Sequence, residues 1–302
     1  MAESKPSQSQ LWEHINQTTI TTKNIDDLTN FKSGSVNHKL ALWNPQTNGV
    51  RYLKALIYNL SASLSEDNWD RLQKTKNRDF GNPLTVNFKG YDICLDYLQA
   101  VHELEFINEN INLTGKTILE IGAGYGRTCH TILSNHDIKR YFIIDLDNCL
   151  LLAKKYLEQV LDNTNYLKIH FISITDIDRI QDNKFDLAFN IDSLAEMEEE
   201  VVKYYLEYIA NNCSAFYVKN PVGKYLDKSL NTQPEDDKVK SMALNTGVLR
   251  DVIDIHNNHE VEAKVKQFKG AYKPGNNWQC SADSWAIPWS YYWQAFYKKR
   301  KG

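Results

Sequence analysis

The predicted fold depends on one stretch of sequence, Thr117-Ile118-Leu119-Glu120-Ile121-Gly122-Ala123-Gly124-Tyr125-Gly126-Arg127. A short apolar run with strand character is followed by three glycines at alternate positions and then by residues that can start a helix. Glycines are required where φ is positive or where a ligand approaches the main chain closely. Short apolar runs are ambiguous alone, but the glycine loop and the helical pattern behind it favour a parallel strand. The stretch therefore predicts a strand, a tight loop and a helix N-terminus.

A regular alternation of strands and helices continues from this stretch. Apolar segments with strand character recur at residues 141–145, 170–172, 185–190 and 215–218. Helical patterns separate them, near residues 126–134, 149–161 and 205–209. Such alternation with short connections is typical of a parallel sheet that is covered on both faces. We therefore predict an α/β fold with a doubly wound sheet.

The regions on either side of the alternation have other patterns. Residues 11–110 are mainly helical, with Ser65 as the candidate N-cap of a helix near 66–75 and a long amphipathic helix over about 93–111. After the parallel strands we expect a helix over 246–256, an alternating strand over 261–268, a loop over 269–290 and a last strand over 291–298. The last two strands are expected to extend the sheet edge, one of them antiparallel.

Composition limits the classes of protein that the chain can represent. Its 302 residues are 42% hydrophobic and 24% charged, which suits a soluble protein with a sizeable core. The net charge of −3 gives no indication of a nucleic-acid partner. The five cysteines show no C-x-x-C spacing, so reduced thiols fit better than a disulfide framework or a zinc site. Residues 1–10 are polar and no apolar run approaches the ~20 residues of a membrane span, so we expect a cytoplasmic protein.

The glycine stretch matches two other kinds of nucleotide-binding loop only in part or not at all. The dinucleotide fingerprint G-x-G-x-x-G accommodates Gly122 and Gly124, but its last position is Arg127 here, with the third glycine at 126. No G-K-[ST] follows, which excludes a P-loop. An NAD-dependent oxidoreductase stays open as an alternative.

The G-x-G-x-G form preceded by Glu120 resembles motif I of the class I S-adenosylmethionine (SAM)-dependent methyltransferases. Ile144-Asp145-Leu146 resembles the post-I motif of that family, and Phe185-Asp186-Leu187 resembles its fourth-strand opening. The resemblance implies a Rossmann-like sheet over residues 114–302 that binds SAM, preceded by a helical region for substrate binding and oligomerisation over residues 1–113. It implies cofactor contacts from Glu120, Gly122, Ala123, Gly124, Asp145, Leu146, Thr175, Asp176 and Asn190. Among these, Asp145 would bind the ribose hydroxyls, and Thr175 with Asp176 would lie near the adenine.

A narrower resemblance rests on the segment Asn190–Met197, the helical N-terminal extension and the Trp-rich end. Together these features are similar to the sugar O-methyltransferase family. That resemblance implies a sugar, nucleotide-sugar or glycan acceptor in surface-polysaccharide or glycosylated natural-product biosynthesis. A small phosphorylated or carboxylic metabolite is the alternative acceptor, and a non-catalytic scaffold with this fold is the alternative from another class.

Methyl transfer to a hydroxyl requires a group that removes the hydroxyl proton. Asp192 is the first candidate base and Glu196 the second, although Asp192 could simply cap the next helix. No ligand cluster supports a metal independently, but a divalent ion, if required, would use these two acids. Polar residues near the predicted carboxyl edge of the sheet are candidate substrate ligands: Arg127, Ser193, Lys219 and Asn220.

Overall fold

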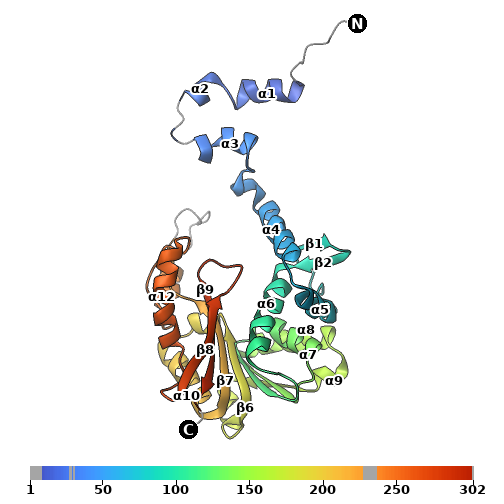
Figure 1. Cartoon of the computed structure of the whole chain (residues 1–302), viewed down its shortest axis with the longest axis vertical. Helices are drawn as coiled ribbons and strands as arrows, with labels where there is room; N and C mark the ends of the chain where they lie inside the picture. The colour runs from blue at the N-terminus through green and yellow to red at the C-terminus, as the bar shows by residue number, and fades with distance from the viewer. Residues whose placement is uncertain (1–8, 27–28, 30, 227–236, 301–302) are drawn as a thin grey trace. The chain divides into compact units, whose positions relative to one another are not determined.

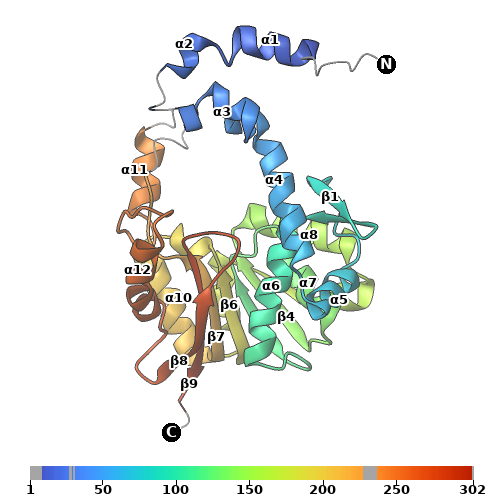
Figure 2. The same cartoon turned by 45° about the horizontal axis from the view of Figure 1, so that its top comes forward.

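The computed structural model describes residues 9–26, 29, 31–226 and 237–300 (Figures 1 and 2). The chain divides into two compact units between Asn59 and Leu60. The described part of the first unit is helical and contains α1 (Gln10–Thr18), α2 (Thr22–Ile25), η1 (Phe31–Ser33), α3 (Ser35–Leu40) and most of α4 (Pro45–Ala62). Among the described residues, no helix combines the length and the apolar character needed to cross a bilayer. Every predicted site residue belongs to the second unit.

The second unit is organised around one sheet. Its described residues form seven strands in the order β5-β4-β3-β6-β7-β9-β8. Neighbours from β5 to β7 pair in parallel, whereas β9 is antiparallel to both β7 and β8. The predicted Rossmann-like sheet is therefore confirmed, and the strand predicted over residues 291–298 is the antiparallel β9. The strands are β3 (Thr117–Ile121), β4 (Arg140–Asp145), β5 (Ile169–Ser173), β6 (Phe185–Ile191), β7 (Cys213–Pro221), β8 (Trp278–Trp285) and β9 (Tyr292–Lys299).

Helices cover both faces of this sheet (Figure 1). Along β3, Leu119 and Ile121 pack with α10 (Glu199–Asn212) and α12 (Asn258–Ala271), whereas Ile118 packs on the other face. Alternate side chains of a strand point to opposite faces, so one apolar run supplies both layers of core. The helices of the other face are α6 (Leu95–Asn110), α7 (Arg127–Asn135) and α8 (Asp147–Val160).

The second unit begins with elements that precede the sheet. Helix α5 (Glu66–Lys74) starts as predicted, because the Ser65 hydroxyl accepts a hydrogen bond from the Asn68 amide at 3.2 Å. A short hairpin, β1 (Thr85–Phe88) and β2 (Tyr91–Cys94), leads directly into α6. Helix α6 belongs to the same compact unit as the sheet, although the expected division at residue 113 separates the two.

Three predictions for the end of the chain were wrong. Residues 261–268 lie inside the helix α12, because Val261 and Phe268 are buried seven residues apart and Asn257 caps the helix N-terminus. The expected helix over 246–256 is absent from these described residues, where Gly247 has φ +73° and Val252 forms a bridge to Lys224. The expected loop over 269–290 contains β8, whose polar sequence gains strand structure from pairing with β9.

Candidate functional site

The glycine loop joins β3 to α7 at the carboxyl edge of the sheet. Gly122 has φ +74°, and a Cβ there would collide with the Ser193 side chain. Gly124 has φ +57°, but open space surrounds the position that its Cβ would take. The Ala123 carbonyl accepts the Gly126 amide at 2.9 Å, which closes the turn. Glycine is therefore required at residue 122 by packing and conformation, and at residue 124 a ligand can approach the main chain.

Asp145 ends β4 and contacts this loop. Its Oδ2 accepts the Gly124 amide at 3.0 Å, and its Oδ1 accepts the Leu146 amide at 2.7 Å. The carboxylate therefore joins the loop after β3 to the loop after β4. Leu146 is 56% exposed beside it, which leaves an apolar side chain at the surface of the edge. The predicted ribose contact stays a prediction, but both carboxylate oxygens retain lone pairs for it.

Thr175 and Asp176 follow β5 in the short helix η2 (Ile174–Ile180). The Thr175 hydroxyl lies 2.9 Å from the Ser173 hydroxyl, and Asp176 forms an ion pair with Arg179 at 3.1 Å. Because β5 pairs with β4 in parallel, this segment lies next to the Asp145 loop along the same edge. The loops after β3, β4 and β5 thus form the continuous edge at which the sequence placed the cofactor.

Asn190 is fully buried near the end of β6, and the surrounding backbone uses its amide. Its Nδ2 donates to the Ile121 carbonyl at 2.8 Å and to the Ser193 hydroxyl at 2.6 Å. Its Oδ1 accepts from Asn220 Nδ2 at 2.8 Å, and the Asn220 Oδ1 accepts the Ala195 amide at 3.2 Å. Asn190 and Asn220 therefore hold β3, β6 and β7 together, and any ligand contact by them would have to replace one of these bonds.

Asp192 lies in the turn after β6 with an unusual backbone. Its φ of +72° is a conformation that side-chain-bearing residues rarely adopt and that is enriched at functional sites. Its Oδ1 accepts the Tyr292 hydroxyl at 2.6 Å, whereas its Oδ2 has no hydrogen bond within the described part of the chain. Burial, followed by the charge of Asp192, raises the pKa of Tyr292, which therefore stays a donor. One carboxylate oxygen is thus held in place and the other is free.

Glu196 lies one turn further along, beyond η3 (Ser193–Ala195). Partial burial and then the charge of Asp192 raise its pKa, so it holds a proton to higher pH than an isolated carboxyl group. Lys224 lies close enough to oppose this rise, and its ammonium donates to the Ala195 carbonyl at 2.8 Å. Among the described residues there is no group of three or more His, Cys, Asp or Glu side chains that could hold a metal ion.

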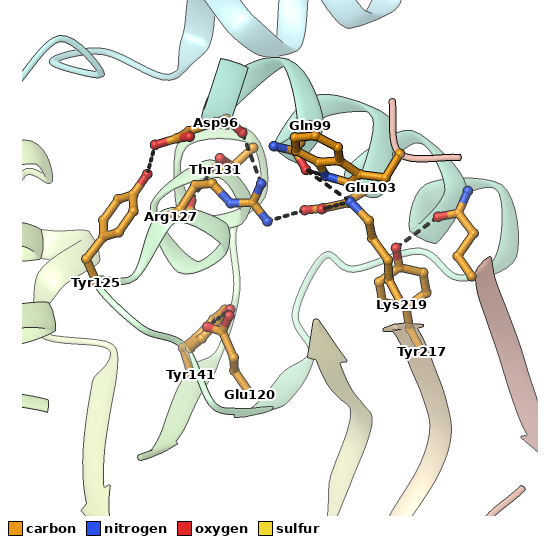
Figure 3. Close-up of polar contacts among 12 residues, drawn as sticks. Asp96, Gln99, Glu103, Glu120, Tyr125, Arg127, Thr131, Tyr141, Tyr217 and Lys219 are labelled. Atoms are coloured by element: carbon orange, nitrogen blue, oxygen red, sulfur yellow. Dashed lines mark hydrogen bonds and ion pairs between the residues drawn. The ribbon is translucent and has the colours of Figure 1, made fainter. Parts of the chain in front are cut away.

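Glu120 lies inside the protein at the end of β3. It is 3% exposed and accepts the Tyr141 hydroxyl at 2.8 Å (Figure 3). Burial raises the pKa of Glu120 to about 8, with Tyr141 lowering it only in part. The carboxyl group is therefore largely protonated at neutral pH. It lies beneath the glycine loop, and the cofactor contact that the family resemblance implied for it stays a prediction.

The pKa of Glu120 makes stability depend on pH. Because the folded value of about 8 lies above the ordinary 4.5, this group stabilises the fold fully below about pH 4.5 and loses that contribution as pH rises through 8. From about pH 6 to about pH 9 we expect wild type to lose about 2–3 kcal/mol more than Glu120→Gln. Urea unfolding at each pH measures this difference, with Glu207→Gln as an exposed control. Parallel curves for wild type and Glu120→Gln would contradict the buried, protonated state.

A buried ion triad lies on the same face of the sheet. Figure 3 shows Glu103 of α6 between Arg127 and Lys219. Its Oε2 lies 2.7 Å from the Arg127 guanidinium, and its Oε1 lies 2.7 Å from the Lys219 ammonium. Glu103 and Lys219 are each 2% exposed. Burial alone would raise the pKa of Glu103, but the two cations hold it below its ordinary value. Arg127 and Lys219, the predicted substrate ligands, are thus already paired with Glu103.

Hydrogen bonds extend this triad toward the glycine loop and toward the end of the chain (Figure 3). Arg127 donates to the Asp96 carbonyl at 3.0 Å, and the Tyr125 hydroxyl donates to the Asp96 carboxylate at 2.9 Å. On the other side, Gln99 Oε1 accepts from the Trp289 indole at 2.8 Å. The first turns of α6 therefore connect the glycine loop with the β8–β9 connection.

Sequence reasoning missed Glu103 and Tyr292. Glu103 lies three residues after Ala100 and four before Ile107, both of which are buried. An acid on an otherwise apolar helix face is a signal for a buried ion pair, because a charge that leaves water needs a partner. The sequence contains no comparable signal for Tyr292, which meets Asp192 across a separation of 100 residues.

Comparisons with known proteins give similarity to solved structures only. No protein-family model matches the sequence, and no curated protein matches it. The magnesium protoporphyrin IX methyltransferase from Synechocystis PCC 6803, solved with bound SAH, is 15% identical over 78% of this chain and 95% of its own, with a TM-score of 0.46. Mitomycin 7-O-methyltransferase is 13% identical over 85% of this chain and 67% of its own, with a TM-score of 0.42. The methyltransferase domain of a bacterial Hen1 protein is 11% identical over 67% of this chain and 99% of its own, with a TM-score of 0.47.

Proposed function

We propose that this chain is a SAM-dependent methyltransferase that binds its cofactor across the carboxyl ends of β3 and β4. The observation that carries the proposal is the glycine loop, where open space adjoins the main chain at Gly124 and Asp145 is hydrogen-bonded to that same residue. An open parallel sheet binds nucleotides at this edge, and a carboxylate after the second strand suits a ribose diol. Exposed Leu146 offers an apolar surface to the base, so the residues present fit a nucleoside cofactor.

We further propose a sugar hydroxyl as the methyl acceptor, on a sugar, nucleotide-sugar or glycan in surface-polysaccharide or glycosylated natural-product biosynthesis. Two exposed indoles support this choice, Trp285 at the end of β8 and Trp289 in the connection to β9. Because Tyr292 pairs with Pro221, that connection lies beside the carboxyl end of β7, where an acceptor could pack on the rings. The alternative acceptor, a phosphorylated or carboxylic metabolite, would need basic side chains around it, and the candidates Arg127 and Lys219 are already paired with Glu103.

The contacts of the described side chains support the role that we propose for each group in the reaction. SAM supplies an activated methyl group on a sulfonium. Asp192 receives the acceptor proton on Oδ2, because Tyr292 holds only Oδ1. Glu196 is the second candidate base, and its raised pKa makes its carboxylate a stronger base than an isolated one. A requirement for a divalent ion on Asp192 and Glu196 stays a prediction.

Calorimetric titration with SAM tests the cofactor part of this proposal. Asp145→Ala should weaken SAM binding by about tenfold or more, because two charge-assisted hydrogen bonds to a diol are lost. Asp182→Ala is the matched control: Asp182 is an exposed acid that precedes β6, at the opposite edge of the sheet, and its loss should leave binding unchanged. Wild-type protein that binds NADH and not SAM would instead support an oxidoreductase. Wild-type protein that binds neither would support a scaffold.

A further inference from the structure

A cavity of about 640 Å³ opens beside the glycine loop, outside the proposed cofactor and acceptor sites. Its walls come from the turn before β1, the start of α6, the glycine loop and α8. Side chains with large apolar surfaces dominate the lining: Phe80, Pro83, Tyr97, Tyr125, Leu152 and Tyr156. Cavities of about 300–1,000 Å³ with such walls and a few polar groups are typical of small-molecule sites.

The aromatic side chains of the cavity are arranged around Tyr156. The ring of Tyr125 lies edge-on to it with centroids 4.9 Å apart, and the ring of Phe80 is tilted against it at 6.0 Å. The Tyr156 hydroxyl lies 2.5 Å from the Tyr97 hydroxyl, and burial raises the pKa of both groups. The tyrosines therefore stay neutral, and the wall presents ring faces and edges that suit a flat ring.

The cavity wall also carries a cation without a carboxylate partner. Arg78 is half-buried, and its Nη1 donates to the carbonyls of Leu72 and Thr75 at 3.2 and 3.1 Å. Within the described ranges no carboxylate lies within 4.0 Å of this guanidinium, and burial lowers its pKa. A second lining cation, Lys155, is exposed, and it too forms no ion pair with another described residue. The Arg78 guanidinium also lies 6.0 Å from the centre of the Tyr91 ring, and an anion would add the partner of opposite charge that these contacts do not supply.

The acids on the wall do not fill this role. The Asp96 carboxylate accepts the Tyr125 hydroxyl, and Glu158 is exposed to solvent. We propose that this cavity is a second ligand site, which binds a small aromatic anion with its ring against Tyr125 and Tyr156 and its charge toward Arg78 and Lys155. Tyr125 is the one lining residue from the glycine loop of the proposed cofactor site, and no lining residue comes from the carboxyl ends of β4, β6 or β7.

Fluorescence titration of the full chain with 8-anilinonaphthalene-1-sulfonate, an anion with a flat naphthalene ring system, tests the proposal. Two pairs of neighbours on α8 provide matched variants. Leu151 and Leu152 are 53% and 56% exposed, but only Leu152 lines the cavity, and Lys155 lines it whereas Lys154 does not. Leu152→Trp should fill the cavity and weaken probe binding by about tenfold, and Lys155→Glu should weaken it by about threefold. Leu151→Trp and Lys154→Glu should remain close to wild type.

Each other outcome overturns the assignment. Equal losses in both members of a pair would mean that the probe binds elsewhere on α8, and an absence of wild-type binding would remove the site. Excess SAH should leave the probe bound. Displacement of the probe by SAH in proportion to SAH binding would show that the cavity is part of the cofactor site and not a second one. All four substitutions are at exposed positions, so circular dichroism should report folded protein in every case.

Discussion

Glu103→Gln should lower the free energy of unfolding by about 3–5 kcal/mol, the largest effect on stability that we expect from one side chain. The reason is the geometry of the triad, in which one carboxylate neutralises two cations. Lys219 is 2% exposed and Arg127 is 15% exposed, so water cannot replace the lost charge. Glutamine keeps the shape of the side chain, but its amide offers one acceptor oxygen and no charge. Two cations would then remain buried beside a neutral group.

Chemical unfolding in urea at neutral pH measures this effect. Glu109→Gln is the matched control, because Glu109 belongs to the same helix and is exposed. Its substitution should change the free energy of unfolding by less than about 0.5 kcal/mol. A double substitution of Glu103→Gln with Lys219→Met should recover part of the loss, since it removes one of the stranded cations. Equal stability of Glu103→Gln and Glu109→Gln would contradict the buried triad.

Asp192→Asn should reduce methyl transfer by about 10²–10⁴-fold while leaving SAM affinity within about twofold. Asparagine tolerates positive φ about as well as aspartate does, so the turn at φ +72° is retained. It can still accept the Tyr292 hydroxyl, but it cannot take up the proton of an acceptor hydroxyl. The loss should therefore appear in kcat, and binding of the cofactor should be spared.

The measurement is transfer of a labelled methyl group from SAM to a panel of sugars and nucleotide-sugars. Glu196→Gln separates the two candidate bases, and we expect it to keep most of the activity. Tyr292→Phe should shift the pH profile of kcat and leave a larger residual activity than Asp192→Asn, because Tyr292 acts only through the carboxylate it holds. If Glu196→Gln loses more activity than Asp192→Asn, Glu196 is the base and the assignment is wrong.

Local sequence was sufficient for the central part of the fold. The strands β3 to β7 and their glycine loop were predicted correctly, because buried parallel strands carry apolar runs and a tight loop with positive φ requires glycine. It was insufficient for residues 261–268, where apolar Val261, Ala263 and Val265 alternate with polar residues as in a strand. The seven-residue spacing of buried Val261 and Phe268 instead fits a helix. The helix forms because Val261 and Phe268 pack into the core beside the sheet and because Asn257 caps the helix N-terminus.

The candidate site also has features that the sequence determined and features that it did not. The sequence by itself determined which residues follow the parallel strands. Because the carboxyl ends of such strands meet at one edge of the sheet, it also placed Gly124, Asp145 and Asp192 at that edge. Only the tertiary structure decided the charge states and the partners. Glu103 meets Arg127 and Lys219 from 24 and 116 residues away, and Glu120 is neutral because its surroundings exclude water. Ionisation depends on burial and on charges that are close in space, and local sequence specifies neither.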